Sequence, residues 1–152
     1  MLTAKAFATC LLLAANTYQV PAAVMIGIMH VEGGHVGQQV GPNFNGTYDL
    51  GPMQVNSRWL PQLAQLWNVD TRTAQTWVRD NGCVNVHVAA WILKQKITET
   101  GNLYSGIASY HSATRGIGYT YANKVVAVME RKGLVRHDNP PAPATHLRYA
   151  ER

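Results

Sequence analysis

The sequence predicts a single α+β domain that is predominantly helical and contains one small β-hairpin region. Its 152 residues suit one domain. Hydrophobic residues make up 47% of the chain and charged residues 14%, which supplies one sizeable core and excludes a disordered protein. Helical patterns cover most of the chain, and a stretch rich in Gly, Asn and Pro at residues 35–56 interrupts them.

The first helix is predicted within residues 5–15, where Phe7, Leu11 and Ala14 recur at helical spacing. The same stretch also resembles a short signal peptide, because a lysine precedes an apolar run. We prefer the helix, because residues 16–21 then form a turn into a second helix.

The second helix is predicted to begin after Pro21, a residue that suits the first helical turn. Almost every residue from 22 to 31 is apolar. A helix that is apolar on every side is a buried helix. Gly33 and Gly34 supply a left-handed end, so this helix is expected to end at Glu32.

Residues 35–56 are predicted to form a long irregular segment that contains the hairpin. Asn45-Gly46 is a strong turn signal, and Thr47-Tyr48 is expected to follow it as a short strand. A segment of this length without regular structure often carries function in a compact chain.

Five more helices are predicted after the hairpin, each from a capping residue, an apolar pattern or a glycine stop. Their expected ranges are Ser57 to about Trp67, Asp70 or Thr71 to about Arg79, about Val84 to Gly101 after a break at Asn81-Gly82, Leu103 to His111, and Gly118 to Lys132 before Gly133. We assign residues 1–136 to the folded domain and residues 137–152 to a flexible tail rich in proline.

The charge balance predicts an anionic partner. Thirteen Lys and Arg residues against eight Asp and Glu residues give a net charge of +5 at pH 7, which would suit nucleic acid, a membrane surface or an acidic polymer. The basic residues are spread along the chain rather than clustered, so nucleic acid is not expected as the partner. The longest apolar run is far shorter than the roughly 18 residues of a membrane span.

Cys10 and Cys83 are the two cysteines of the chain. Two thiols in a cytosolic protein and one disulfide in an exported protein both agree with this number. There is no CxxC pattern that would favour a zinc site built on sulfur. The segment from His30 to His35 also departs from the zinc-protease motif, because a valine separates its first histidine from Glu32. Neither a metal nor a cofactor is expected.

Glu32 differs from the other seven carboxylates of the chain. It ends the most apolar helix, where burial and the negative end of the helix dipole both raise the pKa of a carboxyl group. A carboxylic acid that stays protonated near neutral pH can act as a general acid. The alternative is a side chain at a helix end that points into water. Glu32 is therefore a candidate catalytic residue.

Five segments, taken in order, carry a family resemblance over about residues 8–130. They are Cys10 with Tyr18 and Pro21; His30-Val31-Glu32-Gly33; Asn43 and the run Asn45-Gly46-Thr47-Tyr48-Asp49-Leu50-Gly51-Pro52-Met53-Gln54-Val55-Asn56-Ser57; Cys83-Val84-Asn85-Val86 with Ala90-Trp91-Ile92-Leu93; and Ala108-Ser109-Tyr110-His111-Ser112-Ala113-Thr114 with Tyr121, Ala122, Lys124 and Val125. Together they resemble the lytic transglycosylase domain of the lysozyme-like superfamily. The chain looks most like the small periplasmic members that serve type IV secretion, conjugation, and type III or pilus machines.

This resemblance implies a lysozyme-like fold and cleavage of the β-1,4 bond between N-acetylmuramic acid and N-acetylglucosamine in peptidoglycan. It implies that Glu32 is the sole acid and base, and that the C6 hydroxyl of muramic acid replaces water as the nucleophile, which closes a 1,6-anhydro ring. Tyr110 is expected to hydrogen-bond Glu32. The implied groove residues are Met53, Gln54, Tyr110 and Tyr121, and Asn56 is implied as a groove or loop-bracing residue.

The resemblance also implies where the protein works and with what. It implies a disulfide between Cys10 and Cys83, and therefore a periplasmic protein whose export signal is absent from this chain or already removed. The expected partners are peptidoglycan glycan strands and components of a secretion, conjugation or pilus machine. The protein is expected to be a monomer.

Three residues depart from the family pattern. Gly33 stands where a serine usually follows the catalytic glutamate, Pro52 replaces a usual leucine, and His111 replaces the asparagine that usually follows the tyrosine Tyr110. Two alternatives to a transglycosylase remain. One is a lysozyme-type hydrolase that uses water and a second carboxylate, for which Asp49 is the candidate. The other is a non-catalytic subunit that binds peptidoglycan during assembly of a secretion machine.

Overall fold

The computed structural model describes residues 2–112 and 114–135, and it confirms the predominantly helical α+β class. The helices of this part of the chain are α1 (Ala4–Tyr18), α2 (Ala22–Glu32), α3 (Leu60–Trp67), α4 (Thr71–Asp80), α5 (Gly82–Thr100), α6 (Leu103–His111) and α7 (Arg115–Arg131). The short strands β1 (Gln39–Val40), β2 (Asp49–Leu50) and β3 (Val55–Asn56) form an antiparallel sheet in the order β1-β2-β3. The predicted tail, residues 137–152, lies outside the described residues.

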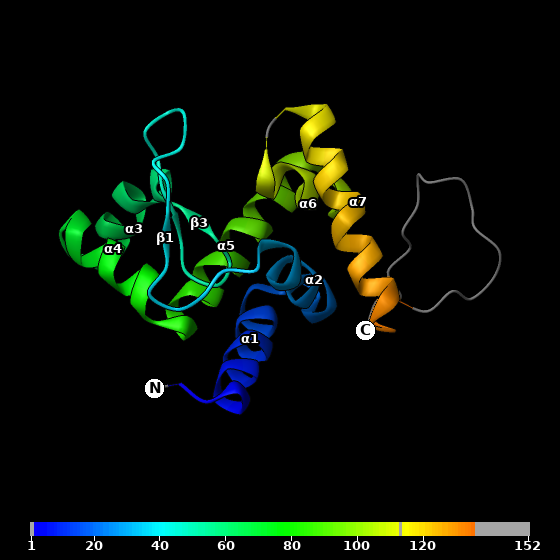
Figure 1. The fold of residues 1–152 in the computed structure, drawn as a ribbon, viewed down its shortest axis with the longest axis horizontal. Helices are drawn as coiled ribbons and strands as arrows, with labels where there is room; N and C mark the ends of the chain where they lie inside the picture. The colour runs from blue at the N-terminus through cyan, green and yellow to red at the C-terminus, as the bar shows by residue number, and fades with distance from the viewer. Residues whose placement is uncertain (1, 113, 136–152) are drawn as a thin grey trace.

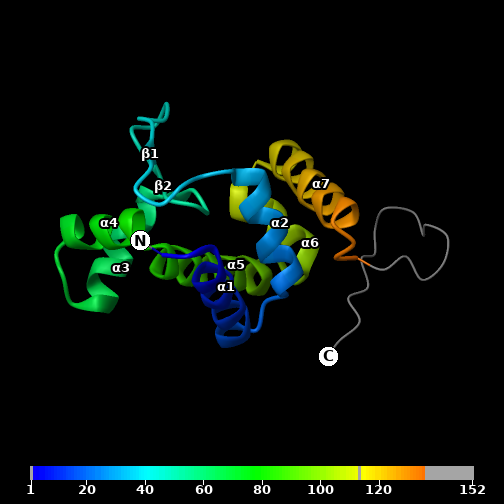
Figure 2. The same cartoon turned by 60° about the horizontal axis from the view of Figure 1, so that its bottom comes forward.

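Helix α5 runs through the middle of the molecule. Figures 1 and 2 both show α3, α4 and the small sheet on one side of it and α2, α6 and α7 on the other. Helix α1 packs on α5, and α6 packs on both α5 and α7. The face of α5 toward the core includes the fully buried Val86, Ala89, Ala90 and Leu93. No described helix is both long and apolar enough to cross the hydrocarbon core of a bilayer.

Helix α2 ends at Glu32, as predicted. Gly33 adopts the left-handed conformation, with φ of 61°, and its N–H donates to the carbonyl oxygen of Met29. Such a cap is the usual reason for a glycine directly after a helix. Helix α2 also crosses α7 at very short range, because Gly27 has no side chain. A Cβ atom on Gly27 would lie 3.0 Å from side-chain atoms of both Val125 and Met129.

The predicted strand at Thr47-Tyr48 is wrong by two residues, since β2 is Asp49–Leu50. The side chain of Asn45 accepts hydrogen bonds from the N–H and the hydroxyl of Thr47. This local turn keeps Thr47 out of the sheet, because Asn side chains readily bond the backbone two residues on. Asn45-Gly46 lies in the loop between β1 and β2.

Two helix starts also differ from the prediction. Ser57 does not cap α3. Its hydroxyl accepts from the N–H of Tyr48, and a short 3₁₀ turn at Ser57–Trp59, capped by Asn56, precedes α3. Helix α7 begins at Arg115, three residues before the expected Gly118.

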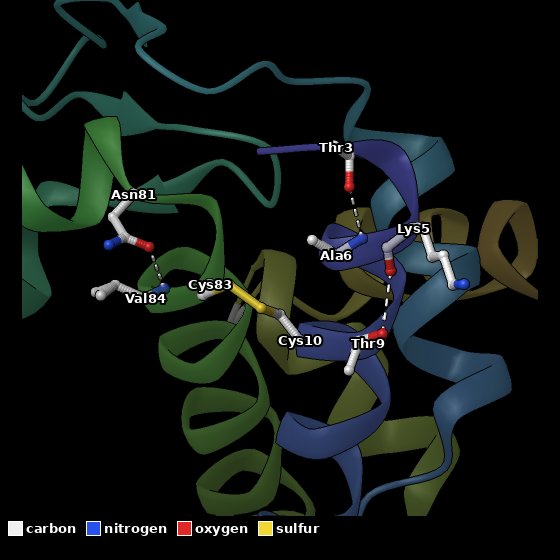
Figure 3. The surroundings of a disulfide bond; sticks show 8 residues. All are labelled: Thr3, Lys5, Ala6, Thr9, Cys10, Asn81, Cys83 and Val84. Atoms are coloured by element: carbon white, nitrogen blue, oxygen red, sulfur yellow. Dashed lines mark hydrogen bonds between the residues drawn. A yellow bond between two sulfur atoms is a disulfide. The ribbon is translucent and has the colours of Figure 1, made fainter. Parts of the chain in front are cut away.

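Cys10 of α1 and Cys83 of α5 form a disulfide, with their Cα atoms 5.2 Å apart (Figure 3). The structure thus agrees with the pairing that the family resemblance implies, and no cysteine of the described chain is free. The bond joins residues 73 positions apart. It closes a long loop and is expected to stabilise the fold by roughly 2–4 kcal/mol. Its place at the start of α5 fixes α1 beside the central helix.

Candidate active site

Glu32 lies at the C-terminal end of α2, with the end of its side chain held by α7. The hydroxyl of Tyr121 donates a hydrogen bond to Oε1 of Glu32 at 2.8 Å. Burial raises the pKa of Glu32 to about 7; the bond from Tyr121 lowers it and the negative charge of Asp49 raises it. Desolvation therefore outweighs the hydrogen bond. The carboxyl group is suited both to give a proton and to take one near neutral pH.

The expected hydrogen bond between Tyr110 and Glu32 is absent from the described structure, and that prediction is wrong. The Tyr110 hydroxyl donates instead to the carbonyl oxygen of Met53 at 3.0 Å. The charge of Glu32 nevertheless reaches Tyr110. Burial, and then the negative charges of Glu32 and Asp49, raise the pKa of the Tyr110 hydroxyl well above its ordinary value. Tyr110 thus ties α6 to the loop that faces Glu32, while Tyr121 holds the acid itself.

Met53 lies in the hydrophobic core rather than at the surface. The prediction that its side chain lines the saccharide groove is wrong, because Met53 is 0% exposed and packs in the core. Gln54 is partly exposed, and its Nε2 donates to the carbonyl oxygen of Gly51 at 2.8 Å. It adopts a left-handed conformation, with φ of 49°. Of these two loop residues, Gln54 alone has side-chain surface that a substrate can reach.

Asn56 braces the sheet next to the site. Its Nδ2 donates to Oδ1 of Asp49 and to the hydroxyl of Thr47, each at 3.0 Å, and its Oδ1 accepts from the N–H of Arg58. The other carboxylate oxygen of Asp49 accepts from the side chain of Asn43 at 3.0 Å. Both oxygens of Asp49 are therefore engaged by amides, and Asn56 serves the loop rather than presenting free polar atoms to a saccharide.

Asn85 is the important residue that the sequence analysis did not single out. It is completely buried in α5, and its side chain makes three hydrogen bonds to backbone groups. Oδ1 accepts from the N–H of Met53 at 2.8 Å, and Nδ2 donates to the carbonyl oxygens of Leu50 and Val78. A buried polar side chain requires such partners. An asparagine between valines on an otherwise apolar helix face was the signal that could have indicated this role.

A cavity of about 450 Å³ opens beside the acid. Its lining includes Glu32 and Val31 from α2, His111 from the end of α6, and Tyr121 and Lys124 from α7. The imidazole ring of His111 stacks on the Tyr121 ring, with centroids 4.4 Å apart and planes 6° apart. The acid and the tyrosine that holds it therefore face one continuous space, which is large enough for part of a saccharide.

The family model for the Transglycosylase SLT domain matches residues 9–124. The chain belongs to this family. A search of curated proteins found no match. Members of the family are peptidoglycan lytic transglycosylases, which are lyases, so this SLT domain is an enzyme that acts on the bacterial cell wall. The matched range contains the helix that ends at Glu32, the loop around Met53 and the tyrosine Tyr121.

Two adjacent glycines shape the SLT domain directly after the acid, and they do so differently. A Cβ atom on Gly33 would meet nothing within 4 Å, so a serine there would have space but would need the left-handed backbone. A Cβ atom on Gly34 would collide with the carbonyl of Gly51 and lie 2.7 Å from Nε2 of Gln54. Gly34 therefore lets the loop of Gly51 and Gln54 approach the end of α2. The replacement of the usual serine by Gly33 does not affect this approach.

Within the described residues of the SLT domain, no group of three or more His, Cys, Asp or Glu side chains is placed to hold a metal ion.

Proposed function

We propose that Glu32 is the acid and the base with which this SLT domain cleaves the bond between N-acetylmuramic acid and N-acetylglucosamine, leaving 1,6-anhydro-muramic acid ends. The observation that carries the proposal is the pKa of about 7 of a carboxyl group that faces the cavity and is held by Tyr121. Among the described residues that line this cavity, Glu32 is the one carboxyl group.

The first step needs the protonated form of Glu32. The carboxyl proton passes to the oxygen that links the two sugars, and the bond from C1 of muramic acid to that oxygen breaks. The positive charge that develops at C1 is shielded by the N-acetyl group of the same sugar. Tyr121 keeps the carboxyl group oriented, and its hydroxyl stabilises the carboxylate that the step leaves behind.

The second step uses that carboxylate as a base. It takes the proton from the C6 hydroxyl of muramic acid, and the C6 oxygen forms a bond to C1. Glu32 is protonated again and no water is consumed. A glycosidase that hydrolyses the bond normally uses a second carboxylate. Asp49, the candidate for it, has both oxygens engaged by Asn43 and Asn56, which favours the transglycosylase over the lysozyme-type alternative.

The products test this proposal directly. Muropeptides released from purified sacculi should be lighter by one water than the products that lysozyme releases from the same sacculi, because the C6 hydroxyl replaces water. Mass spectrometry of both digests gives the comparison. Hydrated reducing ends would contradict the proposal and indicate a hydrolase. Binding to sacculi without any release would indicate the non-catalytic assembly subunit.

The pH dependence tests the role of Glu32. The value of kcat/KM should fall by about tenfold per pH unit above about pH 7, because the proton donor is lost. Tyr121→Phe removes a hydrogen bond that lowers the pKa of Glu32, so this limb should move to higher pH. Asp49→Asn removes a charge that raises that pKa, so the limb should move to lower pH. If the pH profiles of the two variants shift in the same direction, or if neither shifts, Glu32 is not the group that titrates on this limb.

We also propose that the protein is periplasmic, acts as a monomer, and opens the cell wall locally for a secretion, conjugation or pilus machine. The resemblance to the small secretion-linked transglycosylases supports this, as does the disulfide between Cys10 and Cys83, since disulfides persist in oxidising compartments. Fractionation of the source cells, with alkylation of free thiols before lysis, tests the location. A cytoplasmic protein with two alkylated cysteines would contradict it.

A further inference from the structure

The cavity beside Glu32 extends to a cationic side chain on α7 that the proposed chemistry does not use. Gly116, Thr120 and Lys124 follow one another at intervals of four residues, so they form one row along the helix, and all three line the cavity. His111, at the end of α6, lines the same cavity, and the charge of Lys124 reaches its imidazole. We call the portion lined by His111, Thr120 and Lys124 the lysine end of the cavity.

Lys124 has no ion pair with any described residue. Within residues 2–112 and 114–135, Arg79 pairs with Asp80 and Lys96 pairs with Glu99. Glu32 shares the cavity with Lys124, but the two do not form a salt bridge within 4.0 Å. No carboxylate of the described residues therefore neutralises the ammonium group, which faces the cavity beside Glu32.

The neighbours of Lys124 suit an anionic ligand. Burial lowers the pKa of the His111 imidazole; the negative charge of Asp49 raises it, and the positive charge of Lys124 lowers it. A neutral imidazole can still donate one N–H to an anion. The hydroxyl of Thr120, one turn before Lys124, donates to the carbonyl oxygen of Gly116, and a Cβ atom at Gly116 would meet nothing within 4 Å. The lysine end thus combines a cation, the imidazole as a further donor, and open space at its rim.

The substrate of this family supplies such an anion next to the bond that is cut. Each muramic acid carries a lactyl group at C3. The lactyl carboxylate is free when the stem peptide has been removed, and when the peptide is present it is an amide and the peptide contributes carboxylates of its own. In both cases the anion hangs from the sugar whose C1 reacts at Glu32. The shared chemistry is a carboxylate attached through the lactyl arm.

We propose that the lysine end of the cavity binds this carboxylate through Lys124, so that the enzyme positions muramic acid by its anionic substituent. The inference rests on the proposed cleavage at Glu32. It assigns Lys124 to substrate binding and not to the proton transfers. An ammonium–carboxylate contact in a partly open groove is strong enough to alter substrate binding by about tenfold.

The test uses three preparations of the same glycan strands. The first keeps its stem peptides, the second has lost them to an amidase and exposes lactyl carboxylates, and the third has all carboxylates converted to neutral amides with a carbodiimide and ammonia. KM and kcat are measured for the wild type and for Lys124→Gln on each. The assay measures strand cleavage by any mechanism, so it would also detect a hydrolase. The proposed reaction is tested separately, by the masses of the products.

The Lys124→Gln variant should raise KM by about tenfold on a carboxylate-bearing preparation, with kcat nearly unchanged, and should have no effect on neutral strands. An effect on peptide-bearing strands alone identifies the stem carboxylates as the ligand, and an effect on stripped strands alone identifies the lactyl carboxylate. Added salt should raise the KM of the wild type toward that of the variant.

Two matched variants make the result decisive. Lys124→Arg keeps the positive charge and should restore most of the binding. Lys94→Gln removes an exposed lysine of α5 that does not line the cavity, and should change nothing. The proposal is overturned if Lys124→Gln has the same KM as the wild type on every preparation. It is equally overturned if the variant loses as much on neutral strands as on charged ones.

Discussion

Glu32→Gln should lower the turnover of peptidoglycan strands by at least about 100-fold. The amide keeps the shape of the side chain and can still accept a hydrogen bond from Tyr121, but it cannot donate the proton that the leaving oxygen needs. The rate of release of soluble fragments from sacculi measures the effect. Asp49→Asn should lose much less activity, because Asp49 acts on the pKa of Glu32 and on the loop, and transfers no proton.

Thermal unfolding separates this loss from a loss of the fold. The pKa of Glu32 is raised in the folded protein, so the stability associated with the protonated form is complete below the ordinary pKa and is lost as pH rises through about 7. The glutamine of Glu32→Gln cannot ionise. The melting temperature of this variant should therefore rise relative to that of the wild type as the pH increases toward about 7. A variant that is folded and as active as the wild type would remove Glu32 from the mechanism.

Asn85→Ala should lower the free energy of unfolding by about 3 kcal/mol or more, since each buried polar group left without a partner costs roughly 1–3 kcal/mol. The substitution removes the partners of the Met53 N–H and of the carbonyl oxygens of Leu50 and Val78. Activity of the folded fraction should fall as well, because Tyr110 bonds the carbonyl of Met53 in the same loop. Urea unfolding and a sacculus assay at low temperature measure the two effects.

The matched control for Asn85 lies four residues earlier on the same helix. Asn81 caps α5, and its exposed side chain accepts from the N–H of Val84. Asn81→Ala should cost about 1 kcal/mol, the usual value of such a cap. If Asn85→Ala costs no more than Asn81→Ala, the three buried hydrogen bonds do not hold the loop in place.

The parts of the fold that depend on neighbouring residues were predictable from the sequence. The end of α2 at Glu32 follows from the glycine directly after it, and the raised pKa of Glu32 follows from the apolar helix that carries it. One local feature was missed: the strand expected at Thr47-Tyr48 begins two residues later, because the side chain of Asn45 binds Thr47. A propensity for strand could not outweigh that local hydrogen bond.

The parts of the site that depend on packing between distant segments were not predictable in the same way. Tyr110 and Tyr121 lie on different helices, and their distances to Glu32 depend on how α6 and α7 pack. The family resemblance predicted both at the site but gave the hydrogen bond to Glu32 to Tyr110, whereas Tyr121 makes it. The burial of Met53 was also not predictable. It depends on tertiary contacts, among them the hydrogen bond from the Met53 N–H to the side chain of Asn85.

The missing side chain at Gly27 has a consequence for how such an enzyme can adapt. Glu32 lies on α2 and Tyr121 lies on α7. The distance between these two helices is set where Gly27 contacts the side chains of Val125 and Met129. Glu32 lies five residues beyond that crossing, about 7.5 Å along the helix. Small changes of volume at this buried crossing therefore alter the spacing of the acid and the tyrosine, and with it the pKa of Glu32. A substitution in the interior can in this way change the working pH of the enzyme, and it also shifts the cavity residues of α7 relative to Glu32.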